Sequence, residues 1–341
     1  MNLQERKEIF VRLGNYLLSN EQEWQDVTQR AAGENAWFTP EFITLSATNI
    51  ATQYLTEKSL QSLIDRYALP DGNPVAKKVG IVMAGNIPMV GFHDLLCTVL
   101  TGHHAFVKLS SKDSVLIKFV VKKMVEWNPA AETYVTFADM LKGCDAYIAT
   151  GSNNSSQYFA YYFSKYPHII RKNRTSVALL SGDETEPELE RLANDVYQFF
   201  GLGCRNVTQI FVPEGYNFEP LLRAFDKYNY LADHHKYKNN YDYNLAILLL
   251  NNRYYMSNES LLLVEDPSPF SPISQLHYQF YTDKEEVKHR LAGNDAFQCI
   301  VSRENVGFGE AQCPGICDFA DGVDTMQFLV NLNQEKEVRK S

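Results

Sequence analysis

The spacing of hydrophobic residues changes along the chain, and its first part predicts helices. Between residues 1 and 70, apolar side chains recur at helical intervals, as at Ile9, Leu13 and Leu17. Residues 69–74 then bring together Pro, Gly, Asp and Asn, which favour turns and mark a boundary. We therefore expect a helical N-terminal region over residues 1–75.

From residue 78 onward, short apolar segments alternate with amphipathic ones, which predicts an α/β fold with a parallel sheet. Strands are expected at residues 79–84, 105–109, 146–149 and 175–180. Helices are expected between them, at residues 90–100, 114–127, 158–166 and 186–200. In such a fold the loops that follow the strands lie at one edge of the sheet, where ligands bind.

The pattern is less regular in the last third of the chain. It predicts a helix at residues 219–227 and apolar strands at residues 207–212, 245–250, 260–264 and 297–301. Residues 266–273 contain too many prolines for a central strand.

Composition and charge limit the kind of protein. The length of 341 residues is enough for two substantial cores, and 45% hydrophobic with 21% charged residues is ordinary for a globular protein. A net charge of -9 argues against nucleic-acid binding, which needs clustered positive charge. No apolar run is long enough to span a bilayer, and the first residues lack the apolar core of a signal peptide. The expected location is cytoplasmic.

The six cysteines are scattered along the chain, which favours reduced thiols over a disulfide framework. Cys313 and Cys317 are four residues apart, but neither a second pair nor histidines at ligand spacing follow them. We expect no metal site.

Cys204 is the cysteine whose surroundings suggest chemistry. It lies on a loop with Gly201 and Gly203, directly before an apolar strand, and such a loop can display a thiol to a substrate carbonyl. A buried, inert cysteine is the alternative, since burial suppresses thiol reactivity. None of the strand-to-turn junctions has the Gly-x-Gly-x-x-Gly fingerprint, so an ordinary dinucleotide-binding dehydrogenase domain is not supported.

Four features occur in an order that resembles the aldehyde dehydrogenase superfamily: the turn at residues 86–88, the strand that ends at Lys108, the turn at residues 150–152 and the Cys204 loop. Residues 167–176 and 321–325 are similar to the acyl-CoA reductase branch, which includes the fatty-acid reductase of bacterial bioluminescence systems. The resemblance covers about residues 76–330. It implies an aldehyde dehydrogenase-like α/β fold, with a Rossmann-like cofactor domain at 76–198, a catalytic α/β domain at 199–325 and a tail at 326–341.

The resemblance also implies roles for individual residues. Cys204 matches the nucleophile, and Asn86 matches the residue whose amide stabilises the oxyanion, although an ordinary turn asparagine is the alternative. Lys108 matches the lysine that holds the adenosine ribose, and Gly151 with Ser152 matches the turn near the pyrophosphate. Glu265 is the nearest counterpart of a glutamate that contacts the nicotinamide ribose, although its spacing from Phe270 differs from the family pattern.

Ser111 and Lys112, in the loop after Lys108, bear on the choice of cofactor. NAD-preferring relatives often have a glutamate three residues after this lysine, whereas this chain has Ser111 and then Lys112. A carboxylate would repel the 2′-phosphate of NADPH, and a hydroxyl with an ammonium group would not. We therefore expect NADPH in preference to NADH.

Residues 169–174 differ from hydrolytic aldehyde dehydrogenases, because the glutamate that activates water and the glycine pair after it are absent. Transfer of an acyl group between thiols needs no such base. Arg171, Lys172 and Arg174 instead form a basic cluster, which either faces solvent or contacts phosphates of CoA or the cofactor. His168 is either structural or close to the thiolate. Residues 308–309 resemble a loop that lines the substrate tunnel.

Together these features predict an enzyme, an oxidoreductase that reduces a fatty acyl-CoA to the aldehyde through a thioacyl group on Cys204. One alternative is a CoA-acylating aldehyde dehydrogenase that runs toward acyl-CoA. Another is a catalytically degenerate partner subunit of an acyl-transfer complex. The expected partners are an acyl-CoA or acyl-carrier substrate and either a second copy of the chain or an acyl-transfer protein.

Overall fold

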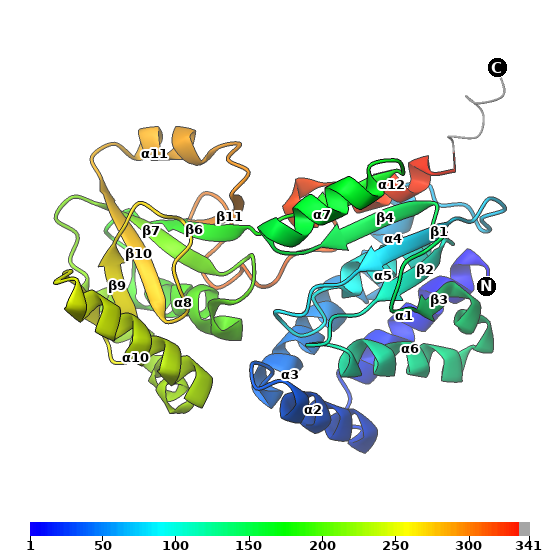
Figure 1. The fold of residues 1–341 in the computed structure, drawn as a ribbon, viewed down its shortest axis with the longest axis horizontal. Coiled ribbons are helices and arrows are strands. Elements are labelled where there is room, and N and C mark those ends of the chain that lie inside the picture. The colour runs from blue at the N-terminus through cyan, green and yellow to red at the C-terminus, as the bar shows by residue number, and fades with distance from the viewer. Residues whose placement is uncertain (334–341) are drawn as a thin grey trace. The chain divides into compact units, whose positions relative to one another are not determined.

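Two mainly parallel β-sheets organise the chain in the computed structural model, which describes residues 1–333 (Figure 1). Tertiary contacts divide the chain into two units, one formed by Met1–Asn173 with the segment from Gly315 onward, and the other by Arg174–Pro314. We call them the first and the second unit.

The first unit is built on a five-stranded sheet with the order β3-β2-β1-β4-β5, in which all neighbours are parallel. Its strands are β1 (Lys78–Val82), β2 (His104–Lys108), β3 (Val135–Phe137), β4 (Ala146–Thr150) and β5 (His168–Arg171). The chain adds strands outward on one side of β1 and then continues on its other side. Open α/β sheets bind ligands at the carboxyl edge, at the point where the strand order reverses in this way.

Helices at both ends of the chain complete the first unit. They are α1 (Leu3–Leu17), α2 (Gln22–Glu34), α3 (Pro40–Asn49), α4 (Glu57–Arg66), α5 (Phe92–Leu100), α6 (Val115–Trp127), α7 (Asn153–Phe163) and α12 (Thr325–Asn331), with shorter turns at η1 (Ile50–Tyr54), η2 (Pro129–Tyr134) and η5 (Ala320–Gly322). The ring of Phe10 in α1 packs edge-to-face on Phe92 in α5, with centroids 6.3 Å apart. His103, just before β2, has its Nε2 3.0 Å from the carbonyl oxygen of Leu329 in α12. Residues 1–70 and 315–333 therefore share one hydrophobic core with the sheet.

The second unit has a six-stranded sheet with the order β11-β6-β7-β10-β9-β8. Its strands are β6 (Thr175–Leu179), β7 (Val207–Pro213), β8 (Met256–Ser257), β9 (Leu262–Glu265), β10 (Gln275–Tyr281) and β11 (Phe297–Val301), and only the short edge strand β8 pairs antiparallel. Its helices are α8 (Glu186–Tyr197), η3 (Gln198–Gly201), α9 (Glu219–Phe225), η4 (Asp226–Asp233), α10 (His235–Leu250) and α11 (Lys284–Leu291).

The strand predicted at residues 245–250 is wrong, because these residues form the last turns of α10. A short run of apolar residues has no periodicity that separates a strand from a helix, and leucine favours the helix. The structure begins this helix ten residues earlier, in the tyrosine-rich segment, with His234 as its N-cap.

The predicted boundary at residue 198 remains a prediction, and residues 334–341 of the predicted tail lie outside the described residues. Within residues 1–333, no helix has both the length and the apolar character that crossing a membrane requires.

Candidate active site

The loop that carries Cys204 lies between η3 and β7 in the second unit, and Cys204 is half-buried there. Asn206 holds this loop against the end of α8. Its side chain is fully buried, and Nδ2 donates hydrogen bonds to the carbonyl oxygens of Asp195 and Gln198, at 3.0 and 2.8 Å. Its Oδ1 accepts a hydrogen bond of 2.8 Å from the backbone N–H of Gly203. One side chain therefore satisfies carbonyls that the end of a helix leaves unpaired and fixes the residue before the thiol.

The chain reverses direction just before this loop through three consecutive left-handed residues. Phe199, Phe200 and Gly201 have φ of +54°, +58° and +74°. This conformation suits glycine but costs a bulky residue about 1–2 kcal/mol. Both phenyl rings are buried, and the ring of Phe200 lies 4.6 Å from that of His234. Burial of the two rings offsets the backbone strain and gives the loop a defined shape.

Ser176 of β6 supports the loop from the sheet. Its hydroxyl donates a hydrogen bond of 3.0 Å to the backbone carbonyl of Cys204, and its N–H donates one of 3.0 Å to the carbonyl of Asn206. The Ser176 Oγ also lies 3.1 Å from the Sγ of Cys299 in β11. Burial raises the pKa of the Cys299 thiol, so this second thiol is a poor nucleophile at neutral pH.

The first unit brings three of the predicted site positions to one sheet edge. Val82, the last residue of β1, is in register with Lys108 of β2 and with Ala149 of β4. Since these strands are parallel, Lys108, the turn that contains Asn86 and the turn at residues 150–152 all follow the carboxyl edge. Asn86 is half-buried and Lys108 is exposed.

Asp113 braces the turn that carries Asn86, a role that the sequence did not suggest. The buried carboxylate accepts a hydrogen bond of 2.6 Å from the backbone N–H of Met89. Burial raises the pKa of Asp113 to about 7. On the other side, a Cβ at Gly85 would lie 2.6 Å from the Oγ of Ser110. The turn and the loop that follows β2 are therefore in close contact, and only glycine fits between them.

The remaining predicted cofactor residues of the first unit are accessible to a ligand. Ser111 and Lys112 are exposed in the loop after β2. Ser152 is exposed and caps α7, where its Oγ accepts a hydrogen bond from the N–H of Ser155. A Cβ at Gly151 would lie 2.9 Å from Phe159 and Ser155, so this glycine allows α7 to pack closely on its own start. These residues offer an ammonium-bearing edge and a helix N-terminus, which suit the phosphates of a dinucleotide.

Glu265 has no such surroundings. It ends β9 and is exposed, and its backbone carbonyl accepts a hydrogen bond of 2.8 Å from Arg253. In the sheet it is in register with Tyr278 of β10, which is in register with Ile210 of β7. It is thus two strands away from β7, level with the middle of that strand, whereas Cys204 lies before its amino end.

The basic cluster at residues 171–174 is divided by the fold. Arg171 is buried in an ion pair with Asp94 of α5, and its Nη2 donates a hydrogen bond of 2.8 Å to the hydroxyl of Thr325. Arg174 donates a hydrogen bond to the carbonyl of Phe297 in the second unit. Lys172 is exposed, so it is the member of the cluster that remains open to a phosphate.

His168 begins β5 and is exposed, with its Nδ1 2.8 Å from the carbonyl oxygen of Tyr166. The loop at residues 308–309 is held by Asp195 of α8, whose carboxylate accepts hydrogen bonds of 2.6 and 3.0 Å from the N–H groups of Gly309 and Ala311. Burial raises the pKa of Asp195 to about 7.

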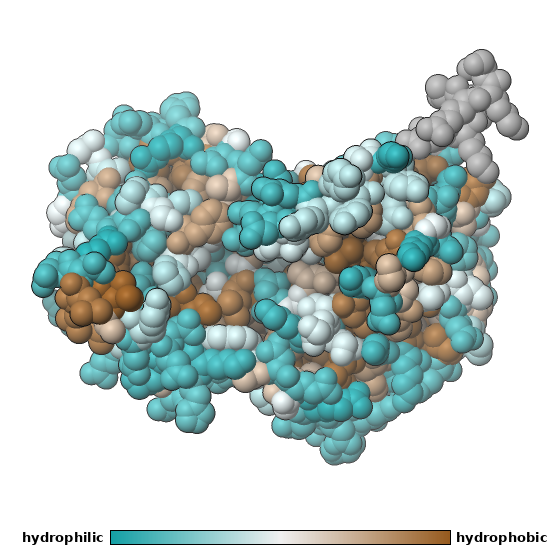
Figure 2. Space-filling view, viewed as in Figure 1, coloured by the Kyte–Doolittle hydropathy of each residue, from teal (hydrophilic) through white to brown (hydrophobic). Residues whose placement is uncertain are grey.

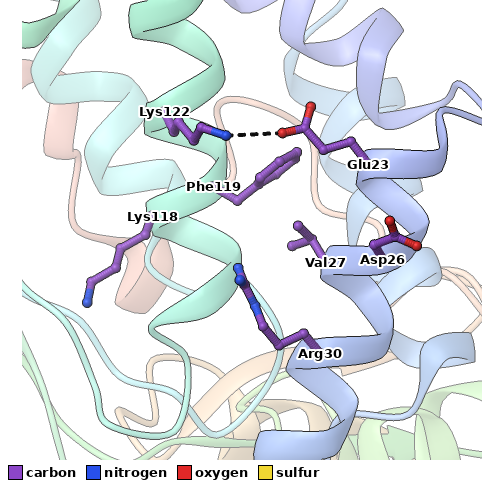
Figure 3. Close-up of a pocket in the computed structure, with 7 residues that line it drawn as sticks. All are labelled: Glu23, Asp26, Val27, Arg30, Lys118, Phe119 and Lys122. Atoms are coloured by element: carbon purple, nitrogen blue, oxygen red, sulfur yellow. Dashed lines mark hydrogen bonds and ion pairs between the residues drawn. The ribbon is translucent and has the colours of Figure 1, made fainter.

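A separate groove of about 460 Å³ lies between α2 and α6 (Figure 3). Its floor is Val27 and Phe119, and Lys122 forms an ion pair of 3.1 Å with Glu23 at its rim. None of the predicted site residues lines it. Among residues 1–333 the structure has no cluster of three or more His, Cys, Asp or Glu side chains that could hold a metal ion.

Comparison with known proteins agrees with the resemblance seen in the sequence. Residues 72–220 match the family model described as acyl-CoA reductase (LuxC). Among curated proteins, no significant sequence match is found.

Solved structures show the fold. Aldehyde dehydrogenase 21 from Physcomitrella patens, in complex with the reaction product succinate, aligns with a TM-score of 0.70 and 11% identity, over 97% of this chain and 84% of that one. A NAD-dependent benzaldehyde dehydrogenase from Corynebacterium glutamicum aligns with a TM-score of 0.64 and 12% identity, over 88% and 76%. Succinic semialdehyde dehydrogenase from Streptococcus pyogenes, in complex with NADP+, aligns with a TM-score of 0.62 and 12% identity, over 88% and 76%. The predicted aldehyde dehydrogenase-like α/β fold and the predicted relationship to acyl-CoA reductases are confirmed.

Proposed function

We propose that this chain reduces an acyl-CoA to the aldehyde, with Cys204 as the nucleophile. Its residues 72–220 match the acyl-CoA reductase (LuxC) family model, and it has the fold of the aldehyde dehydrogenases. The observation that carries the proposal is the Cys204 loop. Its thiol is half-buried, the chain before it is turned by three left-handed residues, and Asn206 and Ser176 hold its backbone on both sides.

The chemistry follows from the thiol. The Cys204 thiolate attacks the thioester carbonyl, the C–S bond to CoA breaks, and the CoA thiolate leaves with the acyl group now on the enzyme. The amide of Asn86 is assigned to the oxygen on which negative charge develops, where one donor contributes about a hundredfold or more in rate. A bound reduced nicotinamide would supply the hydride that converts the acyl group to the aldehyde oxidation level. Release of the aldehyde returns the Cys204 thiolate.

The cofactor is assigned to the carboxyl edge of the first sheet. Lys108, Gly151 and the capped start of α7 are the groups that would hold its ribose and phosphates. Exposed Ser111 and Lys112 support NADPH over NADH, because neither repels a 2′-phosphate. Related structures contain NAD+ in an aldehyde dehydrogenase from Mycobacterium tuberculosis and NADP+ in the Streptococcus pyogenes enzyme, so both forms fit this fold. Glu265 is the candidate for contact with the nicotinamide ribose. Glu265→Ala should therefore weaken cofactor binding, and unchanged binding would remove Glu265 from the site.

The region of the missing glutamate supports thioester chemistry over release of a free acid. Arg171 lies in this region, and its guanidinium is committed to Asp94 and Thr325. Transfer between thiols needs no water-activating base, since the thiolate leaves readily. A CoA-acylating aldehyde dehydrogenase would use the same residues in the opposite direction, and a degenerate partner subunit would keep Cys204 without binding a cofactor.

The test adds a long-chain acyl-CoA and NADPH and follows both the absorbance of NADPH and the release of CoA thiol. We expect the two to change in equal amounts. Cys204→Ala should abolish both, together with covalent acyl labelling of the protein. The matched control is Cys97→Ala, whose thiol is buried in α5 and should not be needed for labelling. Labelling of Cys204→Ala would show that another residue is the nucleophile, and labelling without NADPH oxidation would favour the degenerate subunit.

A further inference from the structure

The peptide group between Pro88 and Met89 is held at both of its polar atoms by buried side chains. Its carbonyl oxygen accepts a hydrogen bond of 2.7 Å from the hydroxyl of Ser46 in α3. Its N–H donates a hydrogen bond of 2.6 Å to the carboxylate of Asp113, in the loop after β2. We call this group the pinned peptide, and Ser46 and Asp113 its two anchors. Two segments that are distant in sequence therefore fix the orientation of one peptide plane.

Ser46 is a polar residue on the apolar side of α3. Phe42, Ile43 and Ala47 belong to the same side and are buried as well. The opposite surroundings are polar, since the surface along α2, which packs beside α3, is mainly hydrophilic (Figure 2). A serine inside a helix can bond a carbonyl of the preceding turn, but the Ser46 hydroxyl bonds the carbonyl of Pro88. Because a buried hydroxyl needs a partner, α3 accepts only a peptide that turns its carbonyl toward it.

The orientation of the pinned peptide imposes an unfavourable backbone conformation on Met89. The φ angle of Met89 is +55°, in the left-handed region that disfavours any residue with a Cβ. A peptide plane rotates through ψ of the residue before it and φ of the residue after it, so the plane and φ of Met89 change together. The hydrogen bonds of the two anchors offset the strain. Removal of either anchor therefore favours rotation of the plane toward a negative φ at Met89.

The chain between Asn86 and the pinned peptide is stiff. The ring of Pro88 fixes its own φ at about −65°. Ile87 is β-branched and precedes a proline, which restricts it to extended conformations. On the other side of Asn86, a Cβ at Gly85 would lie 2.6 Å from the Oγ of Ser110. Asn86 is thus held between a closely packed glycine and the pinned peptide, and rotation of the peptide plane displaces it.

We propose that Ser46 and Asp113 are positioning residues, which hold the amide of Asn86 in place through the pinned peptide. The inference rests on the proposed function, in which Asn86 stabilises the oxygen that gains negative charge. It assigns a part in the reaction to α3, outside the segments that carry the predicted site residues. The charge on this oxygen develops only as the thiolate attacks, so a displaced Asn86 lowers the rate and leaves substrate affinity unchanged.

The kinetic test compares Ser46→Ala, Asn86→Ala and the double variant, with palmitoyl-CoA and NADPH. Ser46→Ala removes a single oxygen, so the protein should fold, and kcat should fall about tenfold while KM changes by less than about twofold. In the Asn86→Ala background, the same substitution should have no further effect, because Ser46 acts through Asn86.

Asp113 provides a second pair of variants. Asp113→Ala should lower kcat as Ser46→Ala does, whereas Asp113→Asn keeps an acceptor oxygen and should retain most of kcat. The matched control is Thr44→Ala in α3. The exposed hydroxyl of Thr44 donates a hydrogen bond of 2.8 Å to the carbonyl of Pro40, and its loss should leave kcat and KM unchanged.

Hydrogen exchange measures the pinned peptide directly, whether or not the protein is active. The N–H of Met89 is buried in a hydrogen bond, so a fragment that covers residues 86–89 should exchange slowly in wild type. Ser46→Ala and Asp113→Ala should raise this exchange rate at least fivefold, and Thr44→Ala should not.

Unchanged exchange in Ser46→Ala would overturn the inference, as would a double variant that loses a further tenfold in kcat. A wild-type protein that releases no CoA thiol, or an Asn86→Ala protein that keeps the wild-type kcat, would overturn the proposed function and this inference with it. An active wild type that depends on Asn86, together with a Ser46→Ala protein at wild-type kcat, would overturn this inference alone.

Discussion

Removal of the Asn206 side chain tests whether one buried amide holds the nucleophile loop. In Asn206→Ala, the N–H of Gly203 and the carbonyls of Asp195 and Gln198 lose their partner inside the protein. Each such hydrogen bond contributes about 1 kcal/mol, and a buried polar group left without a partner costs about 1–3 kcal/mol. Since Asn206 is fully buried, water cannot easily replace the amide. We expect the free energy of unfolding to fall by about 3–5 kcal/mol, measured by urea denaturation.

Asn206→Asp separates the loss of hydrogen bonds from the loss of volume. The substitution keeps the shape but replaces the Nδ2 donor by an oxygen that faces carbonyls, so it should destabilise at least as much as alanine. The control is Asn240→Ala in α10, where the Nδ2 of half-buried Asn240 donates a solvent-exposed hydrogen bond of 2.7 Å to the carbonyl of Lys236. Apart from the effect of helix propensity, this change should lower the free energy of unfolding by less than about 0.5 kcal/mol. An Asn206→Ala protein within about 1 kcal/mol of wild type would refute the reasoning.

Three further substitutions test the first unit. Burial raises the pKa of Asp113 to about 7, above its value near 4 in the unfolded chain, so the fold favours the protonated carboxyl group. The resulting contribution to the free energy of unfolding is fully present below about pH 4 and is lost as the pH rises through 7. Wild type should therefore lose about 2–3 kcal/mol more than Asp113→Asn between pH 5 and 8 in urea titrations, and parallel profiles of the two proteins would contradict this. Asp94→Ala leaves the buried Arg171 cation unpaired and should lower the free energy of unfolding by about 3–5 kcal/mol, whereas a loss below 1 kcal/mol would mean that water reaches the arginine. Gly85→Ala places a Cβ 2.6 Å from the Oγ of Ser110, so the turn that carries Asn86 must shift. We expect kcat for acyl-CoA reduction to fall about tenfold or more, while the melting temperature stays within a few degrees of wild type. An unchanged kcat would show that the turn tolerates the shift.

Local patterns were sufficient for most of the fold. Helical spacing over residues 1–70 and the alternation of strands and helices up to β7 correspond to elements of the structure, because each depends on residues close in sequence. The prediction of a strand at residues 245–250 failed for a physical reason. Six apolar residues suit a strand and a helix equally, and the packing of Leu248 on β9 favours the helix. The association of residues 1–70 and 315–333 with one sheet also depends on contacts between distant segments.

The sequence by itself determined which side chains are candidates for the chemistry, since a thiol that directly follows a glycine, an asparagine turn and a lysine at a strand end are local features. The tertiary structure alone decided their surroundings. It buried Arg171 against Asp94, left Glu265 exposed two strands from β7, and placed Asn206, Ser176 and Asp113 where they hold the loops of the site. The reason is that burial and hydrogen bonding belong to pairs of groups, and the partners of these residues lie up to 154 positions away along the chain, as with Arg171 and Thr325.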